Sequence, residues 1–442
     1  MTDYSKPEFL FGHLRQFRRD QIGFLSQYTD STEIVPLRFL NKQAYLLRDG
    51  EHIHEALVKQ SGKLHKSPAL KNGTKKSLGD GLLTSDDPLH KQQRKLAQPA
   101  FHARHIANYA DTIVAYTDRF IGEWGADSTL EIHEQMMLLT MEIIAKVLFD
   151  ADVSGDAQVF GNAITTAIEA TMQNIGSPLA RFVLTPKQRQ AERDGKILDD
   201  LIYGLIAERQ ASGNNNGDLL SMLLFARDEE TGEGMDIKQL RDECMTLFIA
   251  GHETTANALS WAFYLLAQHP DEWHKLQAEA DRVLGQDRPT FEHVKALTYT
   301  DWVVKESMRL FPPAYITSRL IHEDVQIGGQ LMKAGEILIM SQYLMHHHPA
   351  YWEQPEQFNP QRFETDRNIK DGYFPFGGGV RVCIGNHFAM MEAILILARI
   401  AQRYDVEWIP NQHITAHPAI TLRPDPGIQL RLVMRQPILS PA

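Results

Sequence analysis

A single cysteine inside a glycine-rich segment is the residue of this chain best suited to chemistry. Cys383 lies in Phe376-Gly377-Gly378-Gly379-Val380-Arg381-Val382-Cys383-Ile384-Gly385, and an apolar stretch follows from His387. Glycines allow tight turns and close approach of the backbone. A thiol beside free backbone N–H groups at the start of a helix is expected to have a lowered pKa, which favours the thiolate. Such a thiolate can serve as a nucleophile or as a metal ligand.

The rest of the sequence helps to distinguish between the functions that this cysteine could have. A nucleophile would need a histidine base and an oxyanion hole nearby. A structural zinc site would need two to four cysteines, whereas the one other cysteine, Cys244, lies 139 residues earlier and is expected to be a buried small residue. One thiolate with Arg381 beside it fits haem iron better, since an arginine can bind a propionate. An inert cysteine in a glycine turn would leave Arg381 unexplained.

A second constellation lies in the middle of a long apolar stretch, where the sequence reads Ala250-Gly251-His252-Glu253-Thr254-Thr255. Thr254 follows Ala250 by four residues, so its hydroxyl can bond the Ala250 carbonyl on a helix and bend or open that turn. An opened turn would leave room for dioxygen and water above a haem. Taken alone, two threonines in a helix are usually structural, but beside the cysteine loop the functional interpretation is favoured.

Both constellations resemble those of the cytochrome P-450 family, the haem-thiolate monooxygenases. The pattern Phe376-x-x-Gly379-x-Arg381-x-Cys383-x-Gly385 is similar to the haem-binding loop of that family, and the resemblance covers about residues 80–435. It implies the cofactor haem b (iron protoporphyrin IX), with Cys383 as the axial ligand of the iron. It also implies that Glu253 and Thr254 are the catalytic pair that delivers protons to dioxygen.

The resemblance implies further contacts to haem and a structural triad. Arginine suits the two haem carboxylates because it donates two parallel hydrogen bonds. The residues implied to bind the cofactor are His90, Arg94, Ala250, Arg319, Phe376, Arg381 and Gly385. Many members have a tryptophan where His90 stands. Glu306, Arg309 at i,i+3 spacing, and Arg362 of the segment Pro360-Gln361-Arg362-Phe363 are implied to lock the fold behind the cysteine loop.

The implied reaction inserts one atom of O₂ into an apolar substrate, using two electrons and two protons and releasing the other atom as water. The residues that the resemblance places at the substrate pocket are apolar and predict a hydrophobic small molecule: Leu78, Leu82, Leu83, Ala314, Ile316 and Ile420. Residues 306–363 resemble the members that hydroxylate fatty acids. A long-chain fatty acid is therefore the preferred substrate, with a terpenoid or another secondary metabolite as the alternative.

Electrons are expected from a separate ferredoxin or flavodoxin with its reductase. No G-x-G-x-x-G dinucleotide motif occurs, and the chain ends about 60 residues after Cys383. Ten basic residues but only three acidic ones lie between Ala56 and Ala110. Lys91, Lys95 and Arg104 of this stretch are predicted to dock the acidic partner, the plain alternative being a solvated lysine-rich surface.

Two other classes of function remain open. A peroxide-driven haem enzyme could dispense with proton delivery, which Glu253 and Thr254 argue against. A non-catalytic haem sensor would need neither the opened turn nor an apolar pocket. The run His346-His347-His348 is not predicted to bind a metal, because adjacent residues do not converge on one ion and no cysteine or carboxylate cluster surrounds them.

Helices are expected to position these residues. Apolar residues recur at three- and four-residue spacing over residues 102–124, 131–149, 190–210, 237–268 and 387–404. The fourth stretch, capped by Asp236 and closed by Pro270, predicts a helix about 48 Å long that is buried on most sides. Strand pairs are predicted for 33–39 with 44–48, for 325–327 with 337–340, and for 420–423 with 429–433 around the turn at Pro424.

The predicted fold is mainly α with a small β portion, similar to that of the cytochrome P-450 family. Residues 1–442 are expected to form a single haem-thiolate domain, with β-rich portions at about 30–60, 315–345 and 415–435. The haem is expected between the long central helix and the helix that follows the cysteine loop.

Composition and charge exclude several classes. The 442 residues are 43% hydrophobic and 23% charged, which is typical of a folded chain. The net charge of −11 argues against general binding of nucleic acid. No run approaches the ~18 apolar residues that a membrane span requires, and residues 1–20 lack the pattern of a secretory signal. A cytoplasmic protein without a membrane span is expected.

Overall fold

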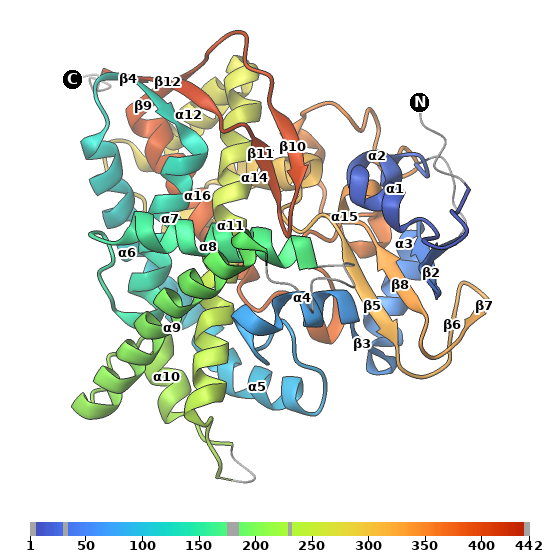
Figure 1. Cartoon of the computed structure of the whole chain (residues 1–442). Coiled ribbons are helices and arrows are strands. Elements are labelled where there is room, and N and C mark those ends of the chain that lie inside the picture. The colour runs from blue at the N-terminus through green and yellow to red at the C-terminus, as the bar shows by residue number, and fades with distance from the viewer. Residues whose placement is uncertain (1–5, 30–33, 175–184, 229–231, 437–442) are drawn as a thin grey trace.

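Helix α11 (Ile237–Gln268) passes through the centre of the structure and contacts α7, α9, α14 and α16 (Figure 1). This computed structural model describes residues 6–29, 34–174, 185–228 and 232–436. The carboxylate of Asp236 caps α11 by accepting a hydrogen bond from the backbone N–H of Gln239 at 2.7 Å, and Pro270 begins the next helix. Most residues of α11 are buried, so the predicted central helix and its bounds are confirmed.

The other four helices predicted from periodicity are also present, with small shifts at their ends: α6 (Ala103–Glu123), α7 (Ile132–Phe149), α9 (Pro186–Ser212) and α16 (Asn386–Arg403). The remaining α-helices of the described part are α1 (Leu14–Arg19), α2 (Gln21–Ser26), α3 (Gly50–His54), α4 (Pro68–Leu78), α5 (Leu89–Ala97), α8 (Ala157–Asn174), α10 (Leu219–Phe225), α12 (Pro270–Leu284), α13 (Phe291–Val294), α14 (Thr298–Leu310) and α15 (Gln342–His346). None of the helices in the described ranges is long and apolar enough to cross a bilayer.

The largest sheet has five strands in the order β1-β2-β8-β5-β3. These strands are β1 (Val35–Phe39), β2 (Lys42–Leu47), β8 (Ile337–Met340), β5 (Thr317–Ile321) and β3 (Leu64–Lys66). Strands β1 and β2 are antiparallel, with Val35 opposite Leu46, as predicted. Strand β8 runs parallel to β2 and antiparallel to β5. The sheet therefore joins strands from the N-terminal part of the chain to strands from its C-terminal half.

The predicted pairing of residues 325–327 with 337–340 is wrong. Strand β6 (Val325–Ile327) pairs with β7 (Gln330–Met332) instead. Gly328 and Gly329 have φ angles of 53° and 77° and close a two-residue turn directly after β6. The fully apolar run at 337–340 is thereby left to the centre of the larger sheet.

The predicted C-terminal hairpin is also wrong. Strand β11 (Leu422–Asp425) pairs with β10 (Thr415–Pro418), while β12 (Gln429–Met434) lies between β4 (Asp127–Glu131) and β9 (Tyr404–Trp408). A Cβ at Gly427 would lie 2.3 Å from the carboxyl carbon of Glu131. This glycine therefore lets the chain pass close to Glu131 and join β4 instead of folding back on β11.

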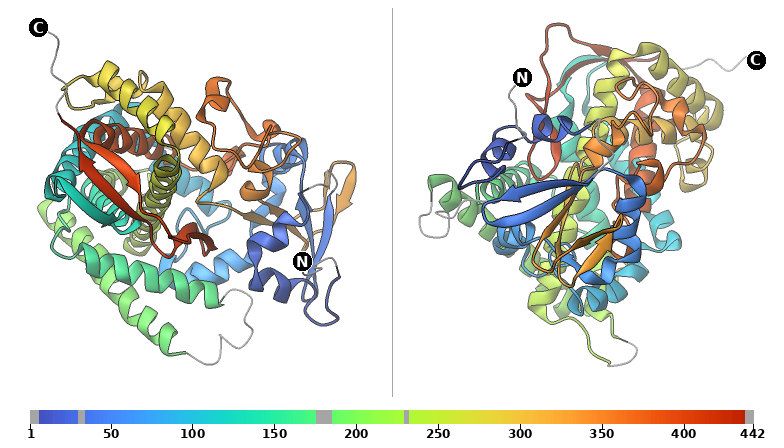
Figure 2. Two further views of the ribbon diagram at one scale, coloured as in Figure 1. Left: turned by 90° about the horizontal axis from the view of Figure 1, so that it is seen from above. Right: turned by 90° about the vertical axis from the view of Figure 1, so that its right-hand side faces the viewer.

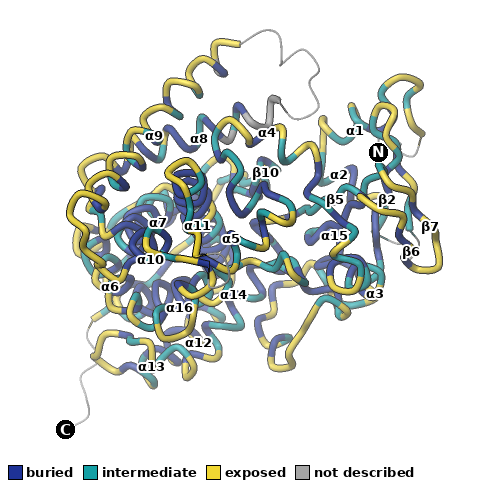
Figure 3. The backbone as a smooth tube through the Cα atoms, turned by 90° about the horizontal axis from the view of Figure 1, so that it is seen from below, coloured by how far each residue is buried: buried dark blue, intermediate teal, exposed yellow. Residues whose placement is uncertain are grey.

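The long helices and the five-stranded sheet lie on different sides of the molecule, with the short helices α1, α2, α3 and α15 beside the sheet (Figures 1 and 2). The largest apolar core lies among α6, α7, α11, α14 and α16, and a second core, including Leu47, Ile53 and Leu338, lies against the sheet. The tube view shows buried backbone along α11 and exposed backbone on the outer helices (Figure 3). Of the residues that the structure describes, 57% are helical and the sheets are small, so the predicted fold class, mainly α with a small β portion, is confirmed.

Candidate active site

The cysteine loop is a tight turn that ends at the start of α16. The backbone N–H of Cys383 donates to the carbonyl of Phe376 at 3.0 Å, which closes the loop across its glycines. Gly379 has φ 64°, and a Cβ there would lie 1.8 Å from the carbonyl oxygen of Leu57, so only glycine fits. Gly385 is the N-cap of α16. The loop thus presents the sulfur of Cys383 at the N-terminal end of a buried helix.

The expected lowering of the Cys383 pKa is wrong for the thiol as it stands. Part of this side chain is accessible, yet burial among protein atoms raises the pKa of the thiol. A hydrogen bond from the N–H of Gly385 and the positive charge of Arg94 act in the opposite direction but are smaller. Desolvation of the thiolate therefore outweighs the helix start and the charge of Arg94.

The turn of α11 at Ala250–Thr255 has the expected hydrogen bond from Thr254 and a second one from Thr255. The hydroxyl of Thr254 donates to the carbonyl of Ala250 at 2.8 Å, and the hydroxyl of Thr255 donates to that of Gly251 at 3.3 Å. Helix α11 continues through this turn without a break. A Cβ at Gly251 would lie 2.7 Å from Ile144, so the glycine lets α7 pack closely against α11. Ala250 is exposed although it lies in the middle of this central helix.

Glu253 points to a partner that the sequence did not reveal. It is buried, and its Oε1 accepts a hydrogen bond from the hydroxyl of Thr421, which in turn accepts one from the side chain of Asn257 at 3.1 Å. Burial raises the pKa of Glu253, while Thr421 and the charge of Arg423 lower it by less. The carboxyl group is therefore biased toward its protonated form. No local sequence signal links residues 253 and 421.

Three arginines and one histidine predicted to bind the cofactor come from three separate segments of the chain and converge at the cysteine loop. Arg94 donates to the carbonyl of Val382 at 2.8 Å, and Arg381 donates to that of Ser85 at 2.8 Å. Arg319, on β5, is 8% exposed, and burial followed by the charge of Arg381 lowers its pKa to about 10. Burial and the same charge lower the pKa of His90 to about 4.

Lys66 belongs to this cluster and was missed in the sequence, where it is one lysine of a lysine-rich stretch. It is buried on β3, opposite Arg319 on β5. Burial, then the charges of Arg319 and Arg381, lower its pKa well below the usual value. Arg319 and Arg381 both line a small cavity of about 10 Å³. Asp86 and Asp87 lie 3.6 and 3.4 Å from Arg381 and offset only part of the positive charge.

The predicted structural triad is assembled in the core. Arg309 donates to both carboxylate oxygens of Glu306, at 2.7 and 2.9 Å, and Arg362 donates to Oε1 of Glu306 at 2.9 Å. The side chains of Glu306 and Arg309 are fully buried. Arg309 also donates to the carbonyls of His346 and Pro355, so the triad ties α14 to the segment that precedes the cysteine loop.

The expected pocket residues differ in burial. Leu78 and Leu82 are buried, Leu83, Ile316 and Ile420 are half-buried, and Ala314 is exposed. Their role in binding a substrate stays a prediction. Cys244 is buried, as expected. His346 is also buried, and its Nε2 accepts the backbone N–H of Phe374 at 3.1 Å, which is a structural contact.

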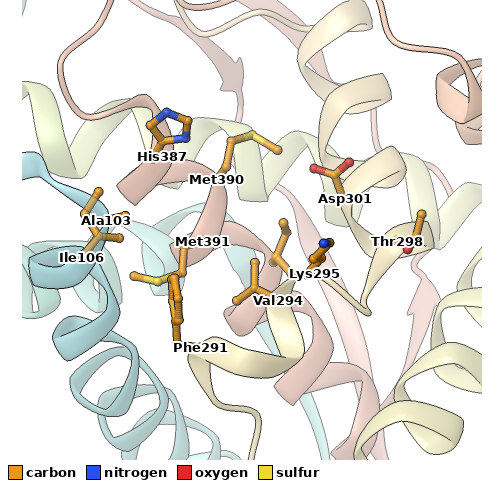
Figure 4. A pocket seen from close by; sticks show the side chains of 11 residues that line it. Ala103, Ile106, Phe291, Val294, Lys295, Thr298, Asp301, His387, Met390 and Met391 are labelled. Atoms are coloured by element: carbon orange, nitrogen blue, oxygen red, sulfur yellow. The ribbon is translucent and has the colours of Figure 1, made fainter.

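A larger pocket lies elsewhere, between α6, α13, α14 and α16 (Figure 4). Its volume is about 440 Å³, and its walls are mostly apolar, with Met390 and Met391 of α16 and Phe291 of α13. Lys295 and Asp301 stand at one side of it. None of the predicted site residues lines it.

A family model of cytochrome P450 matches residues 4–432. The chain belongs to the cytochrome P450 family. Cyclooctatin synthase of Streptomyces melanosporofaciens is 34% identical over 424 residues, which cover 94% of this chain and 92% of the relative. Cyclooctat-9-en-7-ol 5-monooxygenase of the same organism is 33% identical over 410 residues, 91% of this chain and 88% of the relative. Pentalenene oxygenase of Streptomyces avermitilis is 28% identical over 431 residues, 96% of each chain.

Membership of the cytochrome P450 family makes this protein a monooxygenase that incorporates one oxygen atom into its substrate. The family binds haem, iron protoporphyrin IX, through a cysteine thiolate. Its members bind small-molecule substrates and need redox partner proteins.

The residues around Cys383 fit that cofactor. After burial, the charges of Arg319 and Arg381 lower the pKa of Lys66 and that of Arg381 lowers the pKa of Arg319, so a pair of carboxylates beside them would relieve this repulsion. Cys383 and Ala250 have accessible surface on two interior elements that pack together, α11 and the start of α16. A flat apolar ring with two acidic groups at one edge matches this distribution of sulfur, apolar surface and positive charge.

Proposed function

We propose that this cytochrome P450 hydroxylates an apolar terpenoid, with electrons from a separate ferredoxin or flavodoxin and its reductase. The observation that carries this proposal is similarity over almost the whole chain to cyclooctatin synthase and pentalenene oxygenase, which act on terpenoids. The half-buried side chains Leu83, Ile316 and Ile420 are apolar, as such a substrate requires. A long-chain fatty acid, favoured by the sequence of residues 306–363, is the comparison substrate.

In this proposal Cys383 holds the haem iron, and His90, Arg94, Arg319 and Arg381 hold the propionates. Haem bound through a thiolate supplies the activation of dioxygen and the insertion of one oxygen atom. Arg94 and Arg381 also hold two segments together. Arg94 donates to the carbonyl of Val382 in the cysteine loop, and Arg381 donates to the carbonyl of Ser85, which precedes α5. Binding of the propionates would therefore tighten the contact between the start of α5 and the cysteine loop.

Glu253 and Thr254 are proposed to supply and relay the protons that the reaction consumes. Burial favours the protonated carboxyl of Glu253, so this group can hold a proton inside the protein and release it on demand. The hydroxyl of Thr254 is held by the carbonyl of Ala250 and can relay a proton by turning away from it. Phe376 and Gly385 are proposed to border the cofactor on the side of the sulfur.

The acidic redox partner is proposed to dock on the basic surface that includes Lys91 and Arg104. Both residues are exposed, whereas the Nζ of Lys95 lies 3.0 Å from Oδ2 of Asp228, which offsets its charge. Charge reversal at Lys91 and Arg104 should raise the apparent KM for the partner, most strongly at low salt. Lys196→Glu, an exposed lysine on α9, is the matched control. Equal kinetics for all variants would rule out this docking surface.

The same proposal treats residues 1–442 as one haem-thiolate domain acting in the cytoplasm. Contacts of α11 with helices from both halves of the chain support a single unit.

The experiment is a reduced carbon-monoxide difference spectrum followed by a ligand screen. We expect a thiolate-type spectrum that Cys383→Ser abolishes and that Cys244→Ala retains. Cyclic terpenes and terpene alcohols should then shift the Soret band more strongly than long-chain fatty acids. A shift with fatty acids alone would overturn the terpenoid assignment. Turnover with hydrogen peroxide but not with reductant would instead favour a peroxide-driven enzyme, and no ligand response together with no consumption of NADPH would favour a haem sensor.

A further inference from the structure

Two loop tips near the N-terminus carry large apolar side chains into solvent. Phe9 is 91% exposed and Leu10 is 69% exposed. Leu40, at the turn between β1 and β2, is 38% exposed. Single exposed apolar residues are common on protein surfaces, but adjoining ones mark contact sites. We refer to Phe9, Leu10 and Leu40 as the apolar knob.

The apolar knob is held in place by a regular set of hydrogen bonds. Glu8 and Gly12 exchange two backbone hydrogen bonds, both of 2.9 Å, which close the turn that carries Phe9 and Leu10. The backbone N–H of Leu40 donates to the carbonyl of Phe11 at 3.1 Å, which fixes the second tip against the first.

One arginine spans both tips. The guanidinium of Arg38 donates to the carbonyls of Glu8 and of Phe9, the latter at 3.0 Å, and to the carbonyl of Leu40 at 3.1 Å. A Cβ at Gly12 would lie 2.0 Å from the carbonyl oxygen of Arg38, so glycine is required for this approach. The exposure of the knob is thus a property of a defined local structure and not of a frayed end.

Exposed cations flank the apolar knob along the chain, although the net charge of the protein is −11. The nearby exposed cations are Lys6, Arg15, Arg18, Arg19 and Lys42. Of the nearby acids, Glu8 lies 3.6 Å from Arg15, and Asp20 caps α2 by accepting the N–H of Gly23. Arg18, Arg19 and Lys42 make no ion pair within the ranges that the structure describes.

We propose that the apolar knob and its flanking cations bind the surface of an anionic lipid bilayer. The apolar side chains stand on convex loop tips, a shape that inserts among fluid lipids, whereas a protein partner would have to supply a matching hollow. Cations beside the tips would meet acidic headgroups at the depth where the apolar groups enter the hydrocarbon. The chain would then lie on the bilayer at its N-terminal edge, near α1 and β2 (Figure 1).

The test measures partition of the haem-loaded full chain onto vesicles by cosedimentation. The vesicles consist of phosphatidylcholine alone or of phosphatidylcholine mixed with phosphatidylglycerol. We expect binding to the mixed vesicles that falls as salt is raised. Replacing Phe9 and Leu10 together by serine should lower the partition coefficient about tenfold or more. Replacing Arg18 and Arg19 by glutamate should lower it on the mixed vesicles and remove its salt dependence.

Phe225→Ser is the matched control, because Phe225 is a 41% exposed apolar residue on α10, at the other end of the molecule. An unchanged reduced carbon-monoxide spectrum in every variant shows that each one is folded. Equal binding by wild type and the Phe9/Leu10 variant would overturn the proposal. So would a self-association that depends on Phe9 and Leu10 without any vesicle binding, since the knob would then be an interface between copies of the chain.

Discussion

The backbone N–H of Leu82 donates a hydrogen bond to Oε2 of Glu243 at 3.0 Å, which joins the loop after α4 to the N-terminal half of α11. Asp242, the residue before Glu243, holds the same loop, because its Oδ2 accepts a hydrogen bond from the backbone N–H of Asp80 at 3.0 Å. A Cβ at Gly81 would lie 2.2 Å from the hydroxyl oxygen of Thr246, so the loop lies directly on the helix. Two consecutive acids of α11 therefore hold the segment that carries the predicted pocket residues.

Replacing Glu243 by leucine should release this loop. The N–H of Leu82 would lose its acceptor in a buried place, at a cost of about 1–3 kcal/mol in the free energy of unfolding. Hydrogen exchange of the Leu82 amide should accelerate, and the affinity for substrates that reach the loop should fall. Glu243→Gln keeps an acceptor oxygen and is the control. Slow exchange of that amide in the leucine variant would show that Glu243 does not hold the loop.

Two buried acids should make stability depend on pH. Burial raises the pKa of Glu243 and that of Glu392 to about 8 each. Glutamate in an unfolded chain ionises near pH 4.3, so the unfolded state loses these protons first. The contribution of these two carboxyl groups to stability is therefore fully present below about pH 4 and declines as the pH rises toward about 8, where the folded state also begins to ionise.

The variant Glu392→Gln should flatten this decline, because one of the two groups no longer titrates. The measurement is the free energy of unfolding in urea between pH 5 and pH 9. Combining Glu392→Gln with Glu243→Gln should flatten it further. A slope in the double variant as steep as that of the wild type would mean that other groups cause the decline.

Breaking the buried triad should cost far more than breaking an ion pair at the surface. Glu306→Gln removes the charge that Arg309 and Arg362 share, and we expect a loss of about 3–5 kcal/mol in the free energy of unfolding. Arg431→Ala breaks an exposed pair with Asp127, at 2.7 Å, and should cost much less, because water already screens both charges. Similar losses in the two variants would contradict a fold-locking role for Glu306.

Removing the hydroxyl of Thr254 should uncouple electron use from product formation. In Thr254→Ala we expect product per NADPH consumed to fall, with the electrons appearing in hydrogen peroxide, because no group relays the proton. Thr254→Ser restores the hydroxyl and should restore most of the coupling. Glu253→Gln should lower the rate by about 10²–10⁴-fold, the usual contribution of a positioned acid. Full coupling in Thr254→Ala would exclude Thr254 from proton delivery.

Contacts between residues that are close together along the chain were predicted correctly. Thr254 and Ala250 are four residues apart on one helix, so their hydrogen bond follows from helix geometry. The contact of Glu306 with Arg309 follows from i,i+3 spacing in the same way. The bounds of α11 follow from a capping aspartate, a continuous apolar pattern and a terminal proline.

Contacts between residues that are distant along the chain were not predicted. Thr421 binds Glu253, and Lys66 faces Arg319, but no spacing rule connects either pair. The strand partners of 337–340 and of 429–434 were wrong because a strand pattern states which residues alternate, not which strand lies beside them. The pKa of the Cys383 thiol was expected to fall because the helix start was visible in the sequence and the extent of desolvation was not.

The sequence by itself determined the family, the fold class, the sulfur that can bind iron and the threonine that bonds its own helix, because short-range geometry and apolar periodicity are written into neighbouring residues. Only the tertiary structure decided that Lys66 lies with Arg319 and Arg381, that Thr421 meets Glu253, and that Phe9 and Leu10 are held outward together with Leu40. Those relationships join residues that are distant along the chain. Burial and charge at each of them depend on the packing of the whole molecule.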